Sequence, residues 1–213
     1  MSNNPPAIPI ALRRPPSVVA KRGAMKFVLI GVAVFVMAIL GLLTLVMMGA
    51  ETGMKPLVIG MIAAILPVPI YIGICLWLDR FEAEPPIMLA LAFLWGATVA
   101  TFLSFILNTV FGAMIGASLG EKAGQFSMMV VCAPIFEELS KGIALLILFL
   151  WKRNEFDGIV DGVIYATMVA LGFAMTENFL YYGRGFAQQG TQGLTVLFII
   201  RGVMAPFSHP LFT

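Results

Sequence analysis

Long runs of apolar residues constrain this chain more than any other feature of its sequence. The first run extends from Met25 to Met48 and holds a single charged residue, Lys26. About 20 apolar residues are enough to cross a bilayer as a helix. The whole chain is 60% hydrophobic and only 11% charged, against about 25% charged residues in soluble domains. We therefore expect an all-α, polytopic integral membrane protein built as a bundle of transmembrane helices.

The same length rule predicts about six spans. Short polar loops, among them 120–125 and 183–193, separate them. Together the spans form one transmembrane domain over residues 25–213. The chain stops at Thr213, within an apolar run, so we expect further C-terminal spans to be missing from it. The predicted spans lie near residues 25–48, 56–78, 87–109, 126–151, 159–182 and 194–213.

Residues 1–24 differ in composition from the rest. They contain five prolines and four basic residues, which predicts a flexible tail. With this tail inside the cell, eight lysines and arginines fall on the inner side of the predicted spans and three on the outer side. The positive-inside rule therefore places the tail in the cytoplasm. A net charge of +2 gives no case for nucleic-acid binding, and the expected surroundings are the lipid bilayer.

The last three predicted spans carry side chains that lipid cannot accommodate. A charged side chain at the bilayer centre costs at least about 2.5–3.5 kcal/mol. These residues must therefore face one another or a water-filled cavity. They are Glu137, Glu138 and Lys141 in the fourth span, Glu177 and Asn178 in the fifth, and Arg201, Ser208 and His209 in the sixth.

The two adjacent glutamates lie on the same side of the fourth predicted span as the lysine. At 100° per residue, Glu137, Glu138 and Lys141 fall within a 100° arc. Lys141 is placed to pair with Glu137 four residues earlier or with Glu138 three residues earlier. One paired and one unpaired carboxylate suit general-base chemistry. A purely structural ion network would use the same residues.

The histidine lies where the sequence predicts a break in the helix. Pro206 and Pro210 flank His209, the single histidine of the chain. A proline pushes the preceding residue away from helical angles, and broken helices inside membranes line cavities or lie buried in protein. His209 is therefore well placed as a ligand or an acid–base group, with a packed turn residue as the alternative.

Several segments, in this order, resemble the PrsW family of intramembrane proteases, which is more distantly similar to CAAX prenyl proteases and bacteriocin-processing membrane proteases. The strongest is Pro134–Lys141, which contains the pattern Glu-Glu-x-x-Lys. The others are Gly172–Asn178 with the pattern Gly-Phe-x-x-x-Glu-Asn, Arg201 followed by His209–Thr213, the acidic stretch Asp79–Pro85, and Asp157–Ala166.

The resemblance implies an activity and roles for these residues. It implies an endopeptidase of the bacterial cytoplasmic membrane that hydrolyses membrane-anchored proteins, including anti-sigma factors. Glu137 would activate water, and Glu138 would pair with Lys141. Glu177 and His209 would bind a metal, zinc, or polarise the scissile carbonyl. The supporting residues would be Asn178, Arg201 and Thr213.

Two features leave the chemistry and the function class open at this point. One histidine with carboxylates is a poor zinc set beside two histidines and a glutamate, so a metal-free reaction with Glu137 as base stays possible. An ion- or proton-coupled transporter would also use buried charges, although we see no inverted repeats. A catalytically silent scaffold would not require Glu137 and His209 together.

Overall fold

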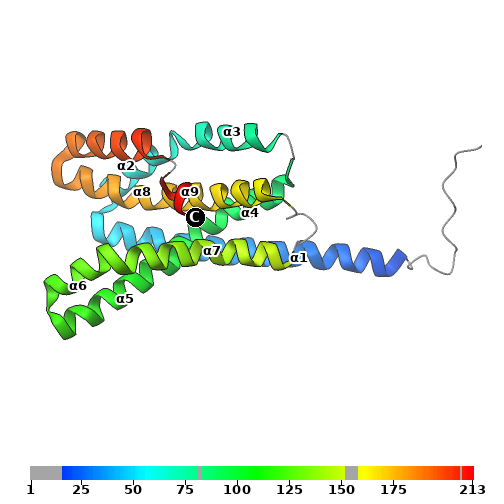
Figure 1. Cartoon of the computed structure of the whole chain (residues 1–213), viewed down its shortest axis with the longest axis horizontal. Coiled ribbons are helices and arrows are strands. Elements are labelled where there is room, and N and C mark those ends of the chain that lie inside the picture. Colours follow the sequence, from blue (N-terminus) through cyan, green and yellow to red (C-terminus); the bar gives the residue numbers. More distant parts are fainter. Residues whose placement is uncertain (1–15, 81–82, 152–157, 207) are drawn as a thin grey trace, which may run out of the picture. The chain divides into compact units, whose positions relative to one another are not determined.

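The computed structural model describes residues 16–80, 83–151, 158–206 and 208–213. All regular secondary structure in these residues is helical (Figure 1). The helices, with η marking π-helical segments, are α1 (Pro16–Thr52), α2 (Met54–Ile65), α3 (Val68–Asp79), α4 (Pro86–Leu94), η2 (Trp95–Ala100), α5 (Thr101–Leu119), α6 (Glu121–Ser127), η3 (Met128–Cys132), α7 (Ala133–Trp151), α8 (Ile159–Leu197), η4 (Phe198–Met204) and α9 (Ser208–Phe212).

Two compact units divide the chain within α1. Residues up to Val36 form one unit, and Met37–Thr213 form the other. Helix α1 begins at Pro16, so it includes the later part of the predicted tail, whose residues 1–15 lie outside the described residues. The contacts discussed below all belong to the second unit.

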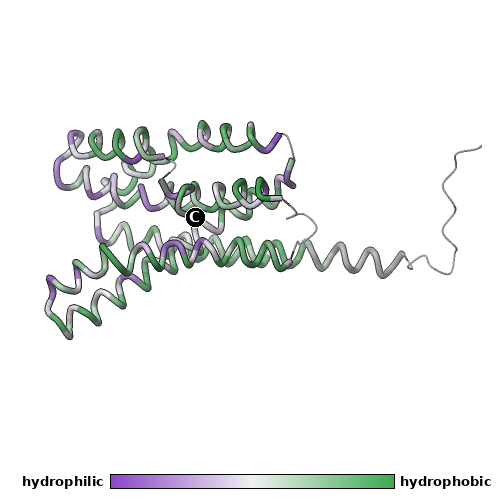
Figure 2. Tube along the Cα trace, in the orientation of Figure 1, coloured by the Kyte–Doolittle hydropathy of each residue, from purple (hydrophilic) through white to green (hydrophobic). Residues whose placement is uncertain are grey.

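Within the described residues, four helical stretches are long and apolar enough to cross a membrane, which confirms an integral membrane protein made of helices. They are Phe27–Thr52, Met54–Asp79, Pro86–Leu119 and Ile159–Leu211. Figure 2 shows these helices coloured mainly as hydrophobic, with hydrophilic positions at helix ends and within α7 and α8. The fourth predicted span, 126–151, is not among them. Its α7 carries two glutamates and a lysine in 19 residues, which lowers its hydropathy.

The stretch Ile159–Leu211 contains a reversal of the chain at Gly190, which Figure 1 shows as a hairpin. Gly190 has φ 64° and ψ −144°, a conformation open to glycine because it lacks a Cβ. Beyond the turn, Arg201 Nη2 lies 2.5 Å from Glu177 Oε2. A straight helix would separate these residues by about 36 Å. The predicted fifth and sixth spans are therefore antiparallel, but helix extends through most of the loop predicted at 183–193.

A short helix, α6, replaces most of the loop predicted at 120–125. The turn between α5 and α6 is made by Gly120 alone, at φ 95°, so the prediction of a polar loop over 120–125 was wrong for the residues that follow. Helix α6 then packs closely against α5: a Cβ on Gly124 would lie 2.6 Å from the carbonyl oxygen of Gly112. Small residues permit this close approach between helices.

Helix α8 lies at the centre of the second unit, against α2, α3, α4 and η2. Two glycines bring its backbone against the helix α4–η2. A Cβ on Gly96 would clash with the Val169 carbonyl, and one on Gly172 would clash with the Phe93 carbonyl. Gly172, the first residue of the Gly-Phe-x-x-x-Glu-Asn segment, is therefore needed for packing. It fixes α8 at the depth from which Glu177 reaches the site described below.

The connection between α3 and α4 is held to the beginning of α8 by buried acidic groups. Tyr165 Oη donates a hydrogen bond to Glu84 Oε2 at 2.6 Å, and the backbone N–H of Glu84 donates to Asp79 Oδ1 at 3.2 Å. Glu84, Asp79 and Asp161 are all buried. Burial raises the pKa of Glu84, the carboxylates of Asp161 and Asp79 raise it further, and the bond from Tyr165 opposes the shift.

This raised pKa predicts a pH-dependent contribution to stability. The folded protein binds the Glu84 proton more tightly than the unfolded chain, so the stabilisation is complete below the unfolded pKa and is lost as the pH rises through the folded pKa. In Glu84→Gln this loss should disappear. We expect the difference in melting temperature, variant minus unsubstituted protein, to become more positive between pH 5 and pH 8. An equal offset at both pH values would contradict the assignment.

Candidate active site

One carboxylate of the paired-glutamate motif is held by ion pairing and hydrogen bonding. Glu138 Oε1 lies 2.7 Å from Lys141 Nζ. Thr213 Oγ1 donates to the other oxygen, Glu138 Oε2, at 2.9 Å. The sequence left open which glutamate pairs with Lys141. In the structure it is Glu138, three residues earlier, and not Glu137, four residues earlier. The structure also brings Thr213, 75 residues further along the chain, onto α7.

Lys141 is the most buried charge in this group, with no exposed surface. Besides Glu138, its Nζ contacts His209 Nδ1 at 3.0 Å and the face of the Phe173 ring at 4.2 Å from the centroid. An ammonium group only donates hydrogen bonds. His209 Nδ1 therefore accepts, and the neutral ring carries its proton on Nε2. Lys141 thus sets the tautomer of the histidine as well as neutralising Glu138.

A second cluster of polar residues faces His209 from α8 and η4. Glu177 Oε2 accepts from His209 Nε2 at 3.1 Å and from Arg201 Nη2 at 2.5 Å. Arg201 Nε donates to Asn178 Oδ1 at 2.6 Å, and its guanidinium lies 4.0 Å from the ring centroid of Tyr181. Two donors from different helices therefore converge on one carboxylate oxygen.

The predicted break is present before Pro206 but not before Pro210, because His209 itself is helical. Segment η4 ends at Met204, and Ala205 leaves helical geometry at φ −124° and ψ 39°. A new short helix, α9, then begins at Ser208 and carries His209 in its first turn. This break lets the chain fold back so that His209 contacts both α7 and α8.

Glu137 differs from Glu138 because no partner among the described residues fixes its carboxylate. Its backbone carbonyl accepts from Ser140 Oγ at 2.9 Å. Among the described residues, none donates a hydrogen bond to its carboxylate. That side chain lines a cavity of about 410 Å³ together with Glu177. Most of the exposed wall is apolar, with Met48, Phe105, Met128, Met129 and Leu180 among its residues, but the ion-paired Glu51 and Arg184 also line it.

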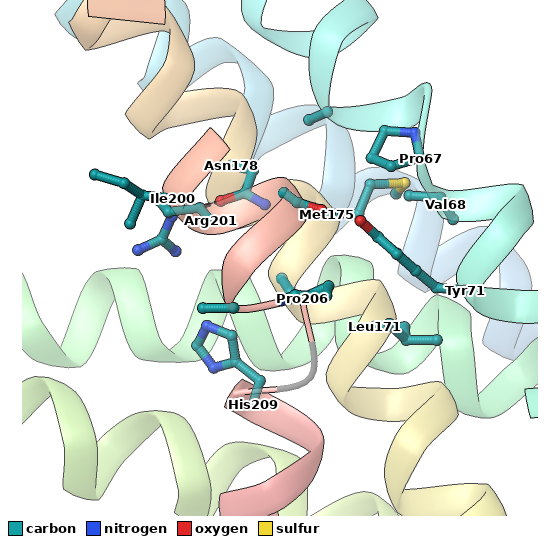
Figure 3. Close-up of a pocket in the computed structure, with 14 residues that line it drawn as sticks. Pro67, Val68, Tyr71, Leu171, Met175, Asn178, Ile200, Arg201, Pro206 and His209 are labelled. Carbon is teal, nitrogen blue, oxygen red and sulfur yellow. Dashed lines mark hydrogen bonds between the residues drawn. The ribbon is translucent and has the colours of Figure 1, made fainter. Parts of the chain in front are cut away.

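A second, smaller cavity, of about 170 Å³, also borders the cluster (Figure 3). Arg201, Asn178 and His209 line it, together with Tyr71 and apolar residues of α2, α3 and α8. Tyr71 Oη donates to the backbone carbonyl of Gly202, which ties α3 to η4. The Glu177–Arg201–His209 network therefore borders both cavities.

Polar residues outside the predicted set hold α7 in place. Ser104 Oγ and Ser140 Oγ are 2.7 Å apart, and Trp95 Nε1 donates to the carbonyl oxygen of Ser140 at 3.1 Å. None of these three residues was predicted as part of the site. Ser140 lies inside the Glu-Glu-x-x-Lys segment, so its place beside two glutamates and a lysine was the available signal.

The donor set around His209 does not match a zinc site in this arrangement. Both ring nitrogens already face protein partners, Lys141 and Glu177, and two cations lie beside the proposed ligands. Catalytic zinc uses three protein ligands and an open position. The described residues contain no group of three or more His, Cys, Asp or Glu side chains arranged to hold a metal ion. Zinc binding by Glu177 and His209 thus stays a prediction, and we derive no step through a metal.

These features define a class of helical membrane proteins that have a cluster of ionisable residues inside the transmembrane domain. The cluster borders a cavity, and the unpaired carboxylate of Glu137 faces this cavity. Residues 84–213 match the family model described as PrsW family intramembrane metalloprotease. The chain belongs to the PrsW family.

Curated relatives agree with this assignment. Protease PrsW of Geobacillus kaustophilus is 30% identical over 135 residues, which cover 63% of this chain and 53% of that protein. Protease PrsW of Clostridioides difficile is 33% identical over 150 residues, covering 68% of this chain and 58% of the relative. The chain thus spans little more than half the length of these relatives. No solved structure matches it.

Proposed function

We propose that this protein is an intramembrane endopeptidase that hydrolyses peptide bonds of membrane-anchored proteins. One observation carries the proposal: two adjacent glutamates have different surroundings. Glu138 is occupied by Lys141 and Thr213, whereas the carboxylate of Glu137 faces a 410 Å³ cavity with no donor among the described residues. A structural ion network would be expected to hold both carboxylates, because unpaired charge in a membrane protein is costly.

In the proposed reaction Glu137 acts as the general base. Its carboxylate removes a proton from a water molecule in the cavity, and the water oxygen attacks the scissile carbonyl carbon. The C–N bond then breaks, and the proton held by Glu137 passes to the leaving nitrogen. The products are a free carboxyl group and a free amine, and Glu137 returns to its starting state.

Positive charge and N–H groups near Glu177 suit the oxyanion formed in the first step. The Nε2–H of His209 and the guanidinium of Arg201 both point at one oxygen of Glu177. Once the Glu177 carboxylate has turned away from these donors, a substrate carbonyl oxygen in that position would accept from the same two groups. Donors already positioned for developing charge are an effective source of catalysis in a site of low dielectric.

The substrate class and the orientation are further parts of the proposal. The family resemblance suggests membrane-anchored proteins, such as anti-sigma factors, as substrates in the bacterial cytoplasmic membrane. A mainly apolar cavity wall suits a segment that comes from the bilayer. The distribution of lysine and arginine supports an N-terminus on the cytoplasmic side.

The test is cleavage by purified protein in lipid nanodiscs. The probes are a panel of synthetic peptides with one apolar segment of about 20 residues, labelled with a fluorophore and a quencher on opposite ends. We expect the unsubstituted protein to cleave members of the panel and His209→Ala to lose about 10²–10⁴-fold in rate, the range of an acid–base or oxyanion group. Thr195→Val, which lies outside this cavity and whose hydroxyl bonds to the Thr191 carbonyl of its own helix, is the control and should keep the rate.

A zinc chelator and metal analysis of the purified protein complete the test. Loss of cleavage with the chelator, restored by zinc, would support the predicted metal. Cleavage that persists with the chelator would support the base mechanism without one. If no panel member is cleaved while proton flux into liposomes depends on Glu137, the peptidase proposal fails and a transporter takes its place.

A further inference from the structure

An amide side chain on α5 shares the cavity of Glu137 and Glu177. Asn108 lies in an apolar stretch of the third predicted span, and sequence reasoning gave it no role. Thr101, Ser104 and Asn108 follow one another at spacings of three and four residues, so they share one face of α5. All three line the 410 Å³ cavity. The polar face of α5 therefore lies opposite the carboxylates of α7 and α8.

Asn108 is the member of this face whose polar atom is not satisfied. Thr101 Oγ1 donates to the Gly96 carbonyl at 2.8 Å, and Ser104 Oγ bonds with Ser140 Oγ. The Oδ1 atom of Asn108 is buried and has no hydrogen-bond partner among the described residues. Leaving a buried acceptor without a partner is unfavourable. Leucine, of similar size, would avoid this cost, so stability alone does not account for an amide here.

The missing partner is a hydrogen-bond donor, and a peptide substrate supplies one. A membrane helix must unwind before its backbone can be cut, and its N–H groups then lack acceptors in a medium that offers none. None of the three carboxylates that line the cavity is available for this: Glu137 is the proposed base, Glu177 is held by Arg201 and His209, and Glu51 is paired with Arg184. The carboxamide of Asn108 turns about a soft terminal torsion, so its oxygen can reach into the cavity as a neutral acceptor.

We infer that Asn108 is a substrate-binding residue, whose Oδ1 accepts a hydrogen bond from a main-chain N–H of the peptide in the cavity. It holds the unwound segment beside Glu137 and takes no part in proton transfer. This inference rests on the proposed peptidase function, since it names the group that positions the same substrate.

The test removes the two ends of this hydrogen bond separately. In the panel peptide that is cleaved fastest, single backbone amides near the scissile bond are replaced one at a time by esters, which have no N–H, while the scissile bond itself stays an amide. At one position we expect the ester to raise KM about 3- to 10-fold for the unsubstituted protein, the range for one neutral hydrogen bond. Asn108→Leu should show the same rise with the all-amide peptide and no further rise with that ester.

Two measurements separate binding from folding and from cleavage. Because Asn108→Leu removes an unsatisfied buried atom, its melting temperature should equal or exceed that of the unsubstituted protein, whereas a structural amide would give a lower one. Binding of the same amide and ester peptides to Glu137→Gln, with and without Asn108→Leu, gives the result without catalysis. Thr195→Val, whose hydroxyl bonds within its own helix outside the cavity, is the control and should keep the ester effect.

The outcomes distinguish this inference from the proposed function. If the unsubstituted protein cleaves the panel but ester effects are the same in Asn108→Leu, the inference is wrong and the peptidase proposal stands. If nothing is cleaved but the peptides bind with an Asn108-dependent ester effect, the binding role stands and the peptidase proposal falls. If no peptide is bound or cleaved, both are overturned.

Discussion

Replacing Glu137 by glutamine should reduce cleavage by about 10²–10⁴-fold, the usual contribution of a general base, with the melting temperature unchanged or raised. Glutamine keeps the size of the side chain and cannot take a proton from water. Because the described residues donate no hydrogen bond to this carboxylate, the substitution breaks no bond of the folded state. The measurement is kcat with the labelled peptide in nanodiscs, together with thermal unfolding of the same preparation.

The adjacent glutamate provides the matched control. Glu138→Gln removes the charge that faces Lys141 and weakens the bond from Thr213. We therefore expect Glu138→Gln to lower the melting temperature and to reduce cleavage less than Glu137→Gln does. The roles assigned to the two residues would have to be exchanged if Glu138→Gln abolished cleavage at full stability while Glu137→Gln remained active.

The second large effect is on stability. Lys141→Met should destabilise the protein by about 2–4 kcal/mol. Removing one partner of a buried ion pair costs about 3–5 kcal/mol, and we expect somewhat less because 33% of the Glu138 side chain remains exposed. The same change removes the donor to His209 Nδ1 and frees the histidine tautomer. Unfolding in detergent micelles, followed by near-ultraviolet circular dichroism, measures the effect.

A double substitution tests the physical cause of this loss. In Lys141→Met/Glu138→Gln the uncompensated charge is gone, so most of the stability should return. Activity should not return, because His209 still lacks its partner. A double variant as unstable as the sum of the two single variants would show that Lys141 acts through packing against Phe173 and not through charge.

Lys141 also illustrates how the site was only partly predictable. Helical periodicity placed Lys141 within reach of both glutamates, and nothing within α7 distinguishes a partner three residues back from one four residues back. The choice depends on Thr213 and His209, which contact Glu138 and Lys141 from a distant part of the chain. Long-range partners of this kind leave no mark on local periodicity.

Asn108 illustrates the opposite case, in which a signal was present and was passed over. A single amide in an apolar span resembles many that bond to neighbouring helices. Its meaning depends on whether that bond exists, and the absence of a partner among the described residues becomes visible only when α5, α7 and α8 are packed together.

The sequence by itself determined the membrane class, the helical fold and the segments that carry the site. Apolar length and the cost of charge in lipid are properties of composition, and every proline lacks the backbone N–H of a helical residue. Only the tertiary structure decided that Gly190 reverses α8, that Glu138 is the paired carboxylate and Glu137 the open one, and that two donors meet at Glu177. Each of these depends on contacts between distant residues, which packing fixes and local sequence does not.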